Sequence, residues 1–349
     1  MRLEDELLIC CARVSLGPQV QARIEALLRE PLDWQILLKR AHWHRIRPLV
    51  DVHLRAQPAG VVPDDVLKKL GDSAGELADR NQRLSRTLDE MAALCEDRGL
   101  RLLAYKGPTL AMDAYGELRL RECGDLDVLV HQDELHHAVE MLKSSGFTSV
   151  RMIRQSGEWD FQRNRVSVDL HWDLAPWWLK YRVDFDRLWE DGVPLAGNSV
   201  FARKLRPEDS LVVLCIHGIK HLWERLRWIC DVAEVVNRGG VTDWDRVEAG
   251  AAETDSRRSV ALGLRLAGDL LSAKLPAEMR RELDQSPVLG RLAAQVGTWL
   301  QHGKRVEASR NSRDRLLFRM MVNDRRRDRL PQLARNLLAR LSCSLQGAP

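Results

Sequence analysis

The chain has 349 residues, of which 45% are hydrophobic, and this is enough to bury a core and to form more than one domain. Its formal charge of +4 is too small to indicate a nucleic-acid-binding protein by itself. No apolar run approaches the roughly 20 residues that cross a bilayer, and Glu4, Asp5 and Glu6 stand where a signal peptide carries basic residues. The sequence therefore predicts a cytoplasmic protein with no membrane partner.

Three parts follow one another along the chain. Residues 1–98 show helical spacing, most clearly in the amphipathic pattern of 76–98, which ends at Gly99. Residues 99–198 form an α/β core, with strands predicted over 100–107, 125–130, 147–155 and 165–174, and helices over 108–116 and 132–146. After a predicted loop at 195–210, residues 199–349 form a C-terminal helical domain, whose clearest helical stretch is 210–240. The fold class is therefore α+β.

The C-terminal 49 residues are basic. They hold twelve Lys and Arg residues against four Asp and Glu residues, and the segment 324–329 reads Asp-Arg-Arg-Arg-Asp-Arg. Such a run is more typical of a solvated helix face than of a polyanion site. Nucleic acid is therefore a possible partner that the sequence does not favour.

Asp125 and Asp127 are the most informative acidic residues. Three Asp-x-Asp triplets occur, about as many as chance gives in so aspartate-rich a chain, so the triplet alone carries no information. These two, however, open the apolar run Val128-Leu129-Val130, and alternate residues of a strand face the same side. Two carboxylates about 6 to 7 Å apart repel each other beside a core unless a cation lies between them. A divalent ion with oxygen ligands fits this position.

A third carboxylate comes from residues 165–174. Val166, Val168, Leu170 and Trp172 occupy one face of that strand, so Asp169 and His171 share the other. If the strand lies beside 125–130, Asp169 completes a cluster of three carboxylates, which is typical of two-metal phosphoryl or nucleotidyl transfer. His171 either contacts the phosphate or acceptor, or orients Asp169 through a hydrogen bond.

Lys106 and Gly107 form a candidate phosphate site ahead of this cluster. Gly107 ends a strand and Pro108 takes the first position of a helix, an arrangement that leaves backbone N–H groups free to bind an anion. Lys106 adds a positive charge. The alternative is an ordinary strand-to-helix turn. What favours a phosphate site is the order of the elements: the turn, a helix, the Asp-x-Asp strand and then the strand with the third aspartate.

That order resembles the DNA-polymerase-β-like nucleotidyltransferase superfamily, and more narrowly a family of uncharacterised bacterial nucleotidyltransferases. The resemblance covers most of residues 100–235. It rests on Lys106-Gly107, Tyr115, Arg121, the Gly124–Val130 motif, the Val168–Trp172 motif, and the downstream stretches His217–Trp223 and Arg227–Asp231. It implies a polymerase-β-like core, a mixed sheet with helices, flanked by helical regions.

The resemblance also implies an activity. A nucleoside monophosphate would move from a nucleoside triphosphate such as ATP to an acceptor, with release of pyrophosphate, and the acceptor would be a small molecule, a peptide or protein, or an RNA. Asp125 and Asp127 would hold both Mg²⁺ or Mn²⁺ ions, and Asp169 would bind the nucleophile-side ion and accept the proton of the acceptor. The Gly107 turn would bind phosphate, with Thr109 replacing the usual serine because Pro108 has no N–H.

Further residues have two interpretations each. Arg121 would neutralise the triphosphate or form a structural ion pair with the aspartate cluster, and Gly124 is assigned to nucleotide binding with its motif. Lys220, His221 and Arg227 would form a wall that closes on the nucleotide or acceptor, or would serve packing. His217 and His221 lack the third ligand that a zinc site needs.

Two other functions fit the sequence less well. The first is a non-catalytic nucleotide-binding protein, regulatory or antitoxin-like, with the same fold. The presence of all three aspartates favours an enzyme instead. A glycosyltransferase that holds a nucleotide-sugar on its Asp-x-Asp motif is expected to carry an α/β nucleotide-binding region upstream, where this chain has helical patterns.

Overall fold

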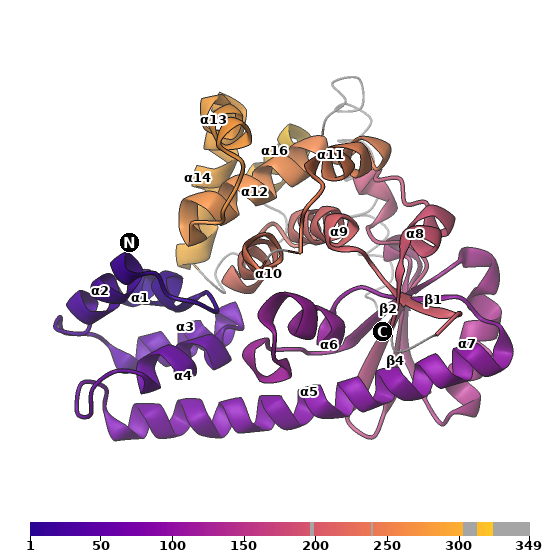
Figure 1. The fold of residues 1–349 in the computed structure, drawn as a ribbon, viewed down its shortest axis with the longest axis horizontal. Coiled ribbons are helices and arrows are strands. Elements are labelled where there is room, and N and C mark those ends of the chain that lie inside the picture. The colour runs from indigo at the N-terminus through magenta and orange to yellow at the C-terminus, as the bar shows by residue number, and fades with distance from the viewer. Residues whose placement is uncertain (196–198, 239, 303–312, 324–349) are drawn as a thin grey trace.

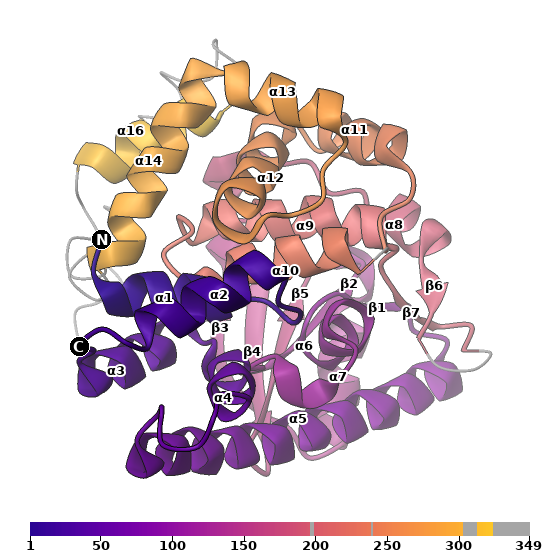
Figure 2. The ribbon, with the colours of Figure 1, turned by 60° about the vertical axis from the view of Figure 1, so that its left-hand side comes forward.

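The structure is a computed structural model that describes residues 1–195, 199–238, 240–302 and 313–323. A mixed sheet lies between helices from both ends of the chain, which confirms the predicted α+β class. In Figure 1 the long helix α5 (Asp64–Arg98) runs along the bottom, with the N-terminal helices above one end of it and the sheet above the other. The C-terminal helices lie at the top in both ribbon views (Figures 1 and 2).

The described part of the chain forms one seven-stranded sheet in the order β3-β4-β5-β2-β1-β7-β6. β2 pairs in parallel with β5 and β1 in parallel with β7, while the other neighbours are antiparallel. The strands are β1 (Leu102–Ala104), β2 (Leu126–Val130), β3 (Thr148–Ile153), β4 (Glu158–Arg163), β5 (Val166–His171), β6 (Val193–Pro194) and β7 (Ala202–Lys204).

The remaining helices belong to three stretches of the chain. Before α5 come α1 (Leu3–Cys11), α2 (Pro18–Leu27), α3 (Trp34–His44) and α4 (Arg47–Arg55). The core contributes α6 (Gly107–Leu110), which continues as a π-helical turn η1 (Ala111–Tyr115), then α7 (Leu135–Ser144) and α8 (Phe185–Asp191). The last stretch holds α9 (Pro207–Lys220), α10 (Leu226–Asn237), α11 (Trp244–Glu253), α12 (Arg257–Leu271), α13 (Ala277–Gln285), α14 (Pro287–His302) and α16 (Arg313–Val322).

Short 3-10 turns complete the core. They are η2 (Leu118–Leu120), η3 (Gln132–Glu134), η4 (Arg154–Ser156) and η5 (Trp177–Leu179).

The alternation of residues along the strands separates the two faces of the sheet. Val128 and Val168 face a core shared with α5 and α7, where Met91 and Leu142 are buried. On the opposite face, Leu129 packs in a second cluster with residues of α8 and α9. Asp127 and Asp169, one position out of step with the valines, therefore lie on the face toward α8 and α9. The sequence prediction that Asp127 and Asp169 share one face is thus confirmed, whereas Asp125 lies outside the strand.

Three segments differ from the sequence prediction. The stretch 210–240 is two helices rather than one, because Leu222 and Trp223 adopt left-handed φ angles of 57° and 54° between α9 and α10. Trp223 is completely buried against Gly218, where a Cβ atom would approach the indole to 2.4 Å. The predicted loop at 195–210 contains β7, and β4 was not predicted at all.

The N-terminal and C-terminal helices share a single hydrophobic core. Leu8 of α1, Leu264 of α12 and Ile229 of α10 belong to the same buried cluster. The long helix α5 joins the two cores, because Val66 and Leu70 near its start belong to this helical cluster whereas Leu84 to Cys95 pack in the core of the sheet. None of the helices in the described ranges is long and apolar enough to cross a membrane.

Candidate active site

Asp127 and Asp169 lie directly opposite each other on neighbouring parallel strands, β2 and β5. His171, two residues further along β5, points from the same face. One ligand atom from each of the three residues lies within 4.8 Å of the other two, which is a separation that a single metal ion can bridge. The structure thus brings together two of the three predicted aspartates, with His171 as the third member of the group.

Asp125 lies just before β2 and is not part of that group. It is close enough for its charge to raise the pKa of Asp169, and it also lines a large cavity next to the site. The sequence placed Asp125 and Asp127 as equivalent ligands. In the structure Asp127 is at the centre of the cluster and Asp125 is at its edge.

Asp127 is buried and has a cation beside it. The Lys106 ammonium lies 2.6 Å from its Oδ1 atom, and the His171 Nε2 atom lies 3.4 Å from the same oxygen. Burial by itself would raise the pKa of Asp127, but Lys106 and His171 hold that pKa well below its usual range. Asp127 is therefore ionised across the physiological range.

Lys106 also donates to His217 of α9, with 3.3 Å between Nζ and Nδ1. Because an ammonium group can only donate, His217 must accept with Nδ1 and is neutral. Burial, followed by the charge of Lys106, lowers the pKa of His217 well below its usual value, in agreement with this assignment. Lys106 thus connects the strand face to the helical domain.

Asp169 is the member of the cluster whose negative charge has no positively charged partner in contact with it. Its carboxylate makes no hydrogen bond or ion pair with any residue that the structure describes, while the charges of Asp125, Asp127 and Asp160 act on it. Burial and these three carboxylates raise the pKa of Asp169 to about 8. A cation bound here would remove the repulsion, so the carboxylate arrangement fits a divalent ion.

His171 completes the donor set. Its side chain is buried, and its ring lies edge-on to Tyr105 with centroids 5.5 Å apart. Its Nε2 atom lies 3.4 Å from Asp127 and its Nδ1 atom 4.0 Å from Glu158, and neither contact has the geometry of a hydrogen bond. A buried imidazole normally has a partner for its nitrogens. Two carboxylates and an imidazole without a well-formed hydrogen bond are ligands that divalent metals accept, so the residues present fit the metal that the sequence implied.

Glu158 and Asp160 are residues of this face that the sequence reasoning missed. Both come from β4, where Asp160 is opposite Asp169 and Glu158 is opposite His171. Lys220 at the end of α9 lies 2.6 Å from the Glu158 carboxylate, and so closes the site from the helical side. The alternation in Glu-Trp-Asp-Phe-Gln-Arg (158–163) was the signal that could have identified this strand.

The Gly107 turn packs against the start of β2. Gly107 has a φ of +61°, and a Cβ atom there would lie 3.3 Å from the Asp125 carbonyl oxygen. Thr109 donates its hydroxyl to the Lys106 carbonyl at 2.6 Å, so in this state the hydroxyl holds the turn in shape. The turn and the Asp-x-Asp strand are therefore neighbours, as the order of motifs suggested.

Arg121 forms a buried ion pair, and its partner is Asp231 of α10 rather than the aspartate cluster. Its Nε and Nη2 atoms donate to the two carboxylate oxygens at 2.7 and 2.9 Å, and the Tyr115 hydroxyl donates to Asp231 at 2.7 Å. This corrects the ion-pair partner expected from the sequence. The contact of Arg121 with phosphate stays a prediction.

The other helical residues line the back of the site. The His221 ring stacks on Trp228 with centroids 4.9 Å apart, and burial lowers the pKa of His221 well below its usual value. Arg227 donates to the Glu122 carbonyl at 2.8 Å. In the described chain, the group of metal-binding side chains is Asp127, Asp169 and His171, and it excludes both His217 and His221.

Gly124 and the basic segment 324–329 are the two remaining features singled out in the sequence. Gly124 lets Arg45 approach the backbone, because a Cβ atom there would lie 3.0 Å from the Arg45 Nη1 atom. The basic segment 324–329, for which nucleic-acid binding was considered, lies outside the described residues.

Comparison with known proteins gives one match. The model of the family described as uncharacterised nucleotidyltransferase matches residues 30–272, which is well over half of the chain. No curated protein and no solved structure matches. The matched region contains the strands, the Lys106-Gly107 turn and the Asp-Asp-His group. The chain therefore belongs to this nucleotidyltransferase family.

Proposed function

We propose that the protein is a metal-dependent enzyme that transfers a nucleoside monophosphate from a nucleoside triphosphate to an acceptor and releases pyrophosphate. The observation that carries the proposal is the pairing of Asp127 with Asp169 on adjacent parallel strands, where the Lys106 ammonium pairs with the buried Asp127 and leaves the half-buried Asp169 without an ion pair. Membership of a nucleotidyltransferase family supports it.

Asp127 and Asp169 would hold Mg²⁺ or Mn²⁺, with Asp125 as a further carboxylate and His171 as a nitrogen ligand or as the group that orients Asp169. A divalent ion bound there supplies positive charge to the triphosphate and activates the attacking oxygen. Mn²⁺ tolerates mixed carboxylate and imidazole ligands more readily than Mg²⁺ does.

The reaction exchanges one phosphorus bond for another. The nucleophilic atom of the acceptor bonds to the α-phosphorus, while the bond from that phosphorus to the α–β bridging oxygen breaks. The electron pair of the broken bond leaves with pyrophosphate. The proton of the acceptor would pass to the Asp169 carboxylate, which a bound cation would keep ionised and ready to act as a general base.

The phosphates of the donor would lie over the Gly107 turn. Lys106 would exchange part of its contact with Asp127 for a phosphate oxygen, and Thr109 and Gly124 would lie along the same path. Lys220 and His221 would close from α9 onto the nucleotide. Arg121 would support the turn from behind, since its Nη1 atom is 3.5 Å from the Gly107 carbonyl.

Incubation of the purified protein with each labelled nucleoside triphosphate, in Mg²⁺ or Mn²⁺, tests the proposal. Metal-dependent release of pyrophosphate is expected from the wild type and not from Asp127→Asn. Binding of the nucleotide with no release, even when a cell extract supplies acceptors, would favour a regulatory or antitoxin-like protein. Absence of metal-dependent nucleotide binding would exclude both.

A further inference from the structure

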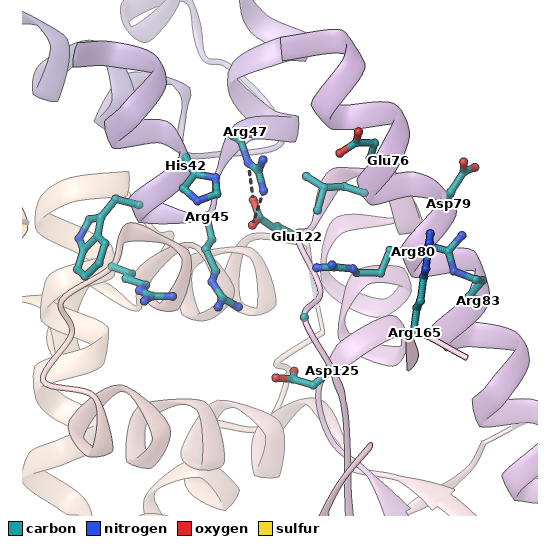
Figure 3. A pocket seen from close by; sticks show the side chains of 14 residues that line it. His42, Arg45, Arg47, Glu76, Asp79, Arg80, Arg83, Glu122, Asp125 and Arg165 are labelled. Carbon is teal, nitrogen blue, oxygen red and sulfur yellow. Dashed lines mark hydrogen bonds and ion pairs between the residues drawn. The ribbon is translucent and has the colours of Figure 1, made fainter. Parts of the chain in front are cut away.

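A cavity of about 930 Å³ lies between the N-terminal helices and the sheet, next to Gly124 and Asp125. Its walls come from the end of α3, the start of α4, the exposed side of α5 and the turn before β5. Figure 3 shows Arg45 on one side of the cavity, with Arg80, Arg83 and Arg165 on the other and Asp125 at its edge. A volume of this size is typical of a small-molecule site.

Arginine dominates the lining. Arg45, Arg47, Arg80, Arg83, Arg165 and Arg225 face four carboxylates, of which Asp125 belongs to the candidate active site. Glu122 is engaged by Arg47, through two hydrogen bonds of 3.1 and 2.8 Å (Figure 3). The other two, Glu76 and Asp79, lie on α5. Within the described chain, Arg45, Arg80, Arg83 and Arg165 form no hydrogen bond or ion pair through their guanidinium groups.

Arg45 forms no ion pair within the described chain, although the charges of Asp125 and Glu122 act on it from a distance. It ends α3 in a left-handed conformation, and Gly124 gives its guanidinium room against the backbone. Burial, followed by the charges of Arg227 and Arg225, lowers the pKa of Arg45 to about 10. Crowding like charges in a partly buried place costs free energy, and an anion in the cavity would recover it.

The cavity lies close to the aspartates of the candidate active site. Arg165 stands four residues before Asp169 on the same chain segment, a span of roughly 13 Å if extended. Gly124 and Asp125 stand just ahead of Asp127, which is about 7 Å from Asp125 along the strand. A molecule anchored among the arginines can therefore reach the reacting carboxylates with a group on the order of 10 Å away.

We propose that the arginine-lined cavity binds the acceptor, and that the acceptor is a small molecule carrying one or more phosphate groups. This inference rests on the proposed nucleotidyl transfer. Guanidinium groups bind phosphate through paired hydrogen bonds, which matches several arginines converging on one space. The donor phosphates have a separate place over Lys106 and Gly107, so the cavity remains for the second substrate.

The test compares two double variants that remove the same charge. Arg45→Gln with Arg165→Gln alters the cavity, whereas Arg29→Gln with Arg86→Gln removes two exposed arginines elsewhere. Calorimetry with inorganic pyrophosphate is done in EDTA and at low salt, because without metal the aspartates of the candidate active site repel an anion. The difference between the two double variants then assigns the binding to the cavity. We expect binding by the wild type, unchanged affinity in the control, and a loss of about tenfold or more in the cavity variant.

Two further arms identify the occupant. Fructose 1,6-bisphosphate should displace pyrophosphate while fructose does not, and octauridylate should compete no better than the bisphosphate. Stronger competition by octauridylate would overturn the assignment to a small molecule. No pyrophosphate binding, or equal binding by both double variants, would overturn the site.

The donor is measured separately, as binding of a nucleoside triphosphate in Mn²⁺. The cavity variant should keep this binding and Asp127→Asn should lose it. Loss of donor binding in the cavity variant would assign the arginines to the donor and overturn the proposal. Absence of donor binding in the wild type would reject the proposed transfer itself, whatever the cavity binds.

Discussion

Asp231 and Asp169 are carboxylates enclosed at the junction of the sheet and the helical domain, yet their surroundings are opposite. Asp231 receives two hydrogen bonds from Arg121 and one from Tyr115. Asp169 receives none from the described residues and faces other carboxylates instead. A buried charge with a complete set of partners is structural, whereas one without partners indicates that a ligand supplies them.

Removing a carboxylate of the candidate metal site should have the largest effect, and that effect should be on activity. Asp127→Asn and Asp169→Asn each remove metal binding worth several kcal/mol in the transition state, so pyrophosphate release should fall by about 10²- to 10⁴-fold. Circular dichroism should show an unchanged fold. Asp133→Asn, an exposed aspartate 89% accessible, is the control and should keep full activity.

Removing Asp231, whose partners are Arg121 and Tyr115, should affect stability instead. Asp231→Ala leaves Arg121 buried with no counter-ion, which should lower the free energy of unfolding by about 3 to 5 kcal/mol. Asp65→Ala breaks an exposed pair with Lys69 and should cost less than about 1 kcal/mol. Equal losses in urea denaturation would contradict the contrast between the two kinds of site.

The pH dependence of the metal-free protein should reveal Asp169. Because its pKa is raised in the folded state, protonation of Asp169 favours folding below about pH 4, and this contribution is lost as the pH rises through about 8. At about pH 8 in EDTA, Asp169→Asn should therefore raise the free energy of unfolding, by on the order of 1 to 3 kcal/mol. Lower stability of the variant at that pH would show that Asp169 has a stabilising partner.

Metal affinity should follow the same ionisation. A carboxylate must lose its proton to bind a cation, so Mn²⁺ affinity should rise by up to about tenfold per pH unit below pH 8 and level off above it. Calorimetry at several pH values measures this directly. A flat profile between about pH 6 and pH 9 would show that Asp169 is not a ligand.

The smallest effect concerns the turn beside the cluster. Gly107→Ala forces a residue with a side chain into a φ of +61° and toward the Asp125 carbonyl, at a cost of about 1 to 2 kcal/mol. Gly75→Ala lies in α5 with open space around its Cβ position and should stabilise by about 0.5 to 1 kcal/mol. Changes of the same sign in thermal unfolding would contradict the role given to the turn.

The features that the sequence predicted are those that local patterns determine. Gly99 ends α5 and Gly107 begins the turn because each adopts a positive φ, and strand alternation placed Asp127 and Asp169 on one face. The pairing of Arg121 with Asp231 spans 110 residues along the chain and depends on how α10 packs, which no local pattern encodes. The same is true of Arg45, whose place beside Gly124 follows from the packing of α3 on the core.

Binding of Mn²⁺, monitored by electron paramagnetic resonance, tests most directly whether Asp127 and Asp169 form a metal site. The wild-type protein should remove free Mn²⁺ from solution with saturation, and more tightly when a nucleoside triphosphate is present. The Asp127→Asn, Asp169→Asn double variant should leave the Mn²⁺ signal unchanged. Equal Mn²⁺ binding by the wild type and the folded double variant would contradict the assignment of this face as the metal centre.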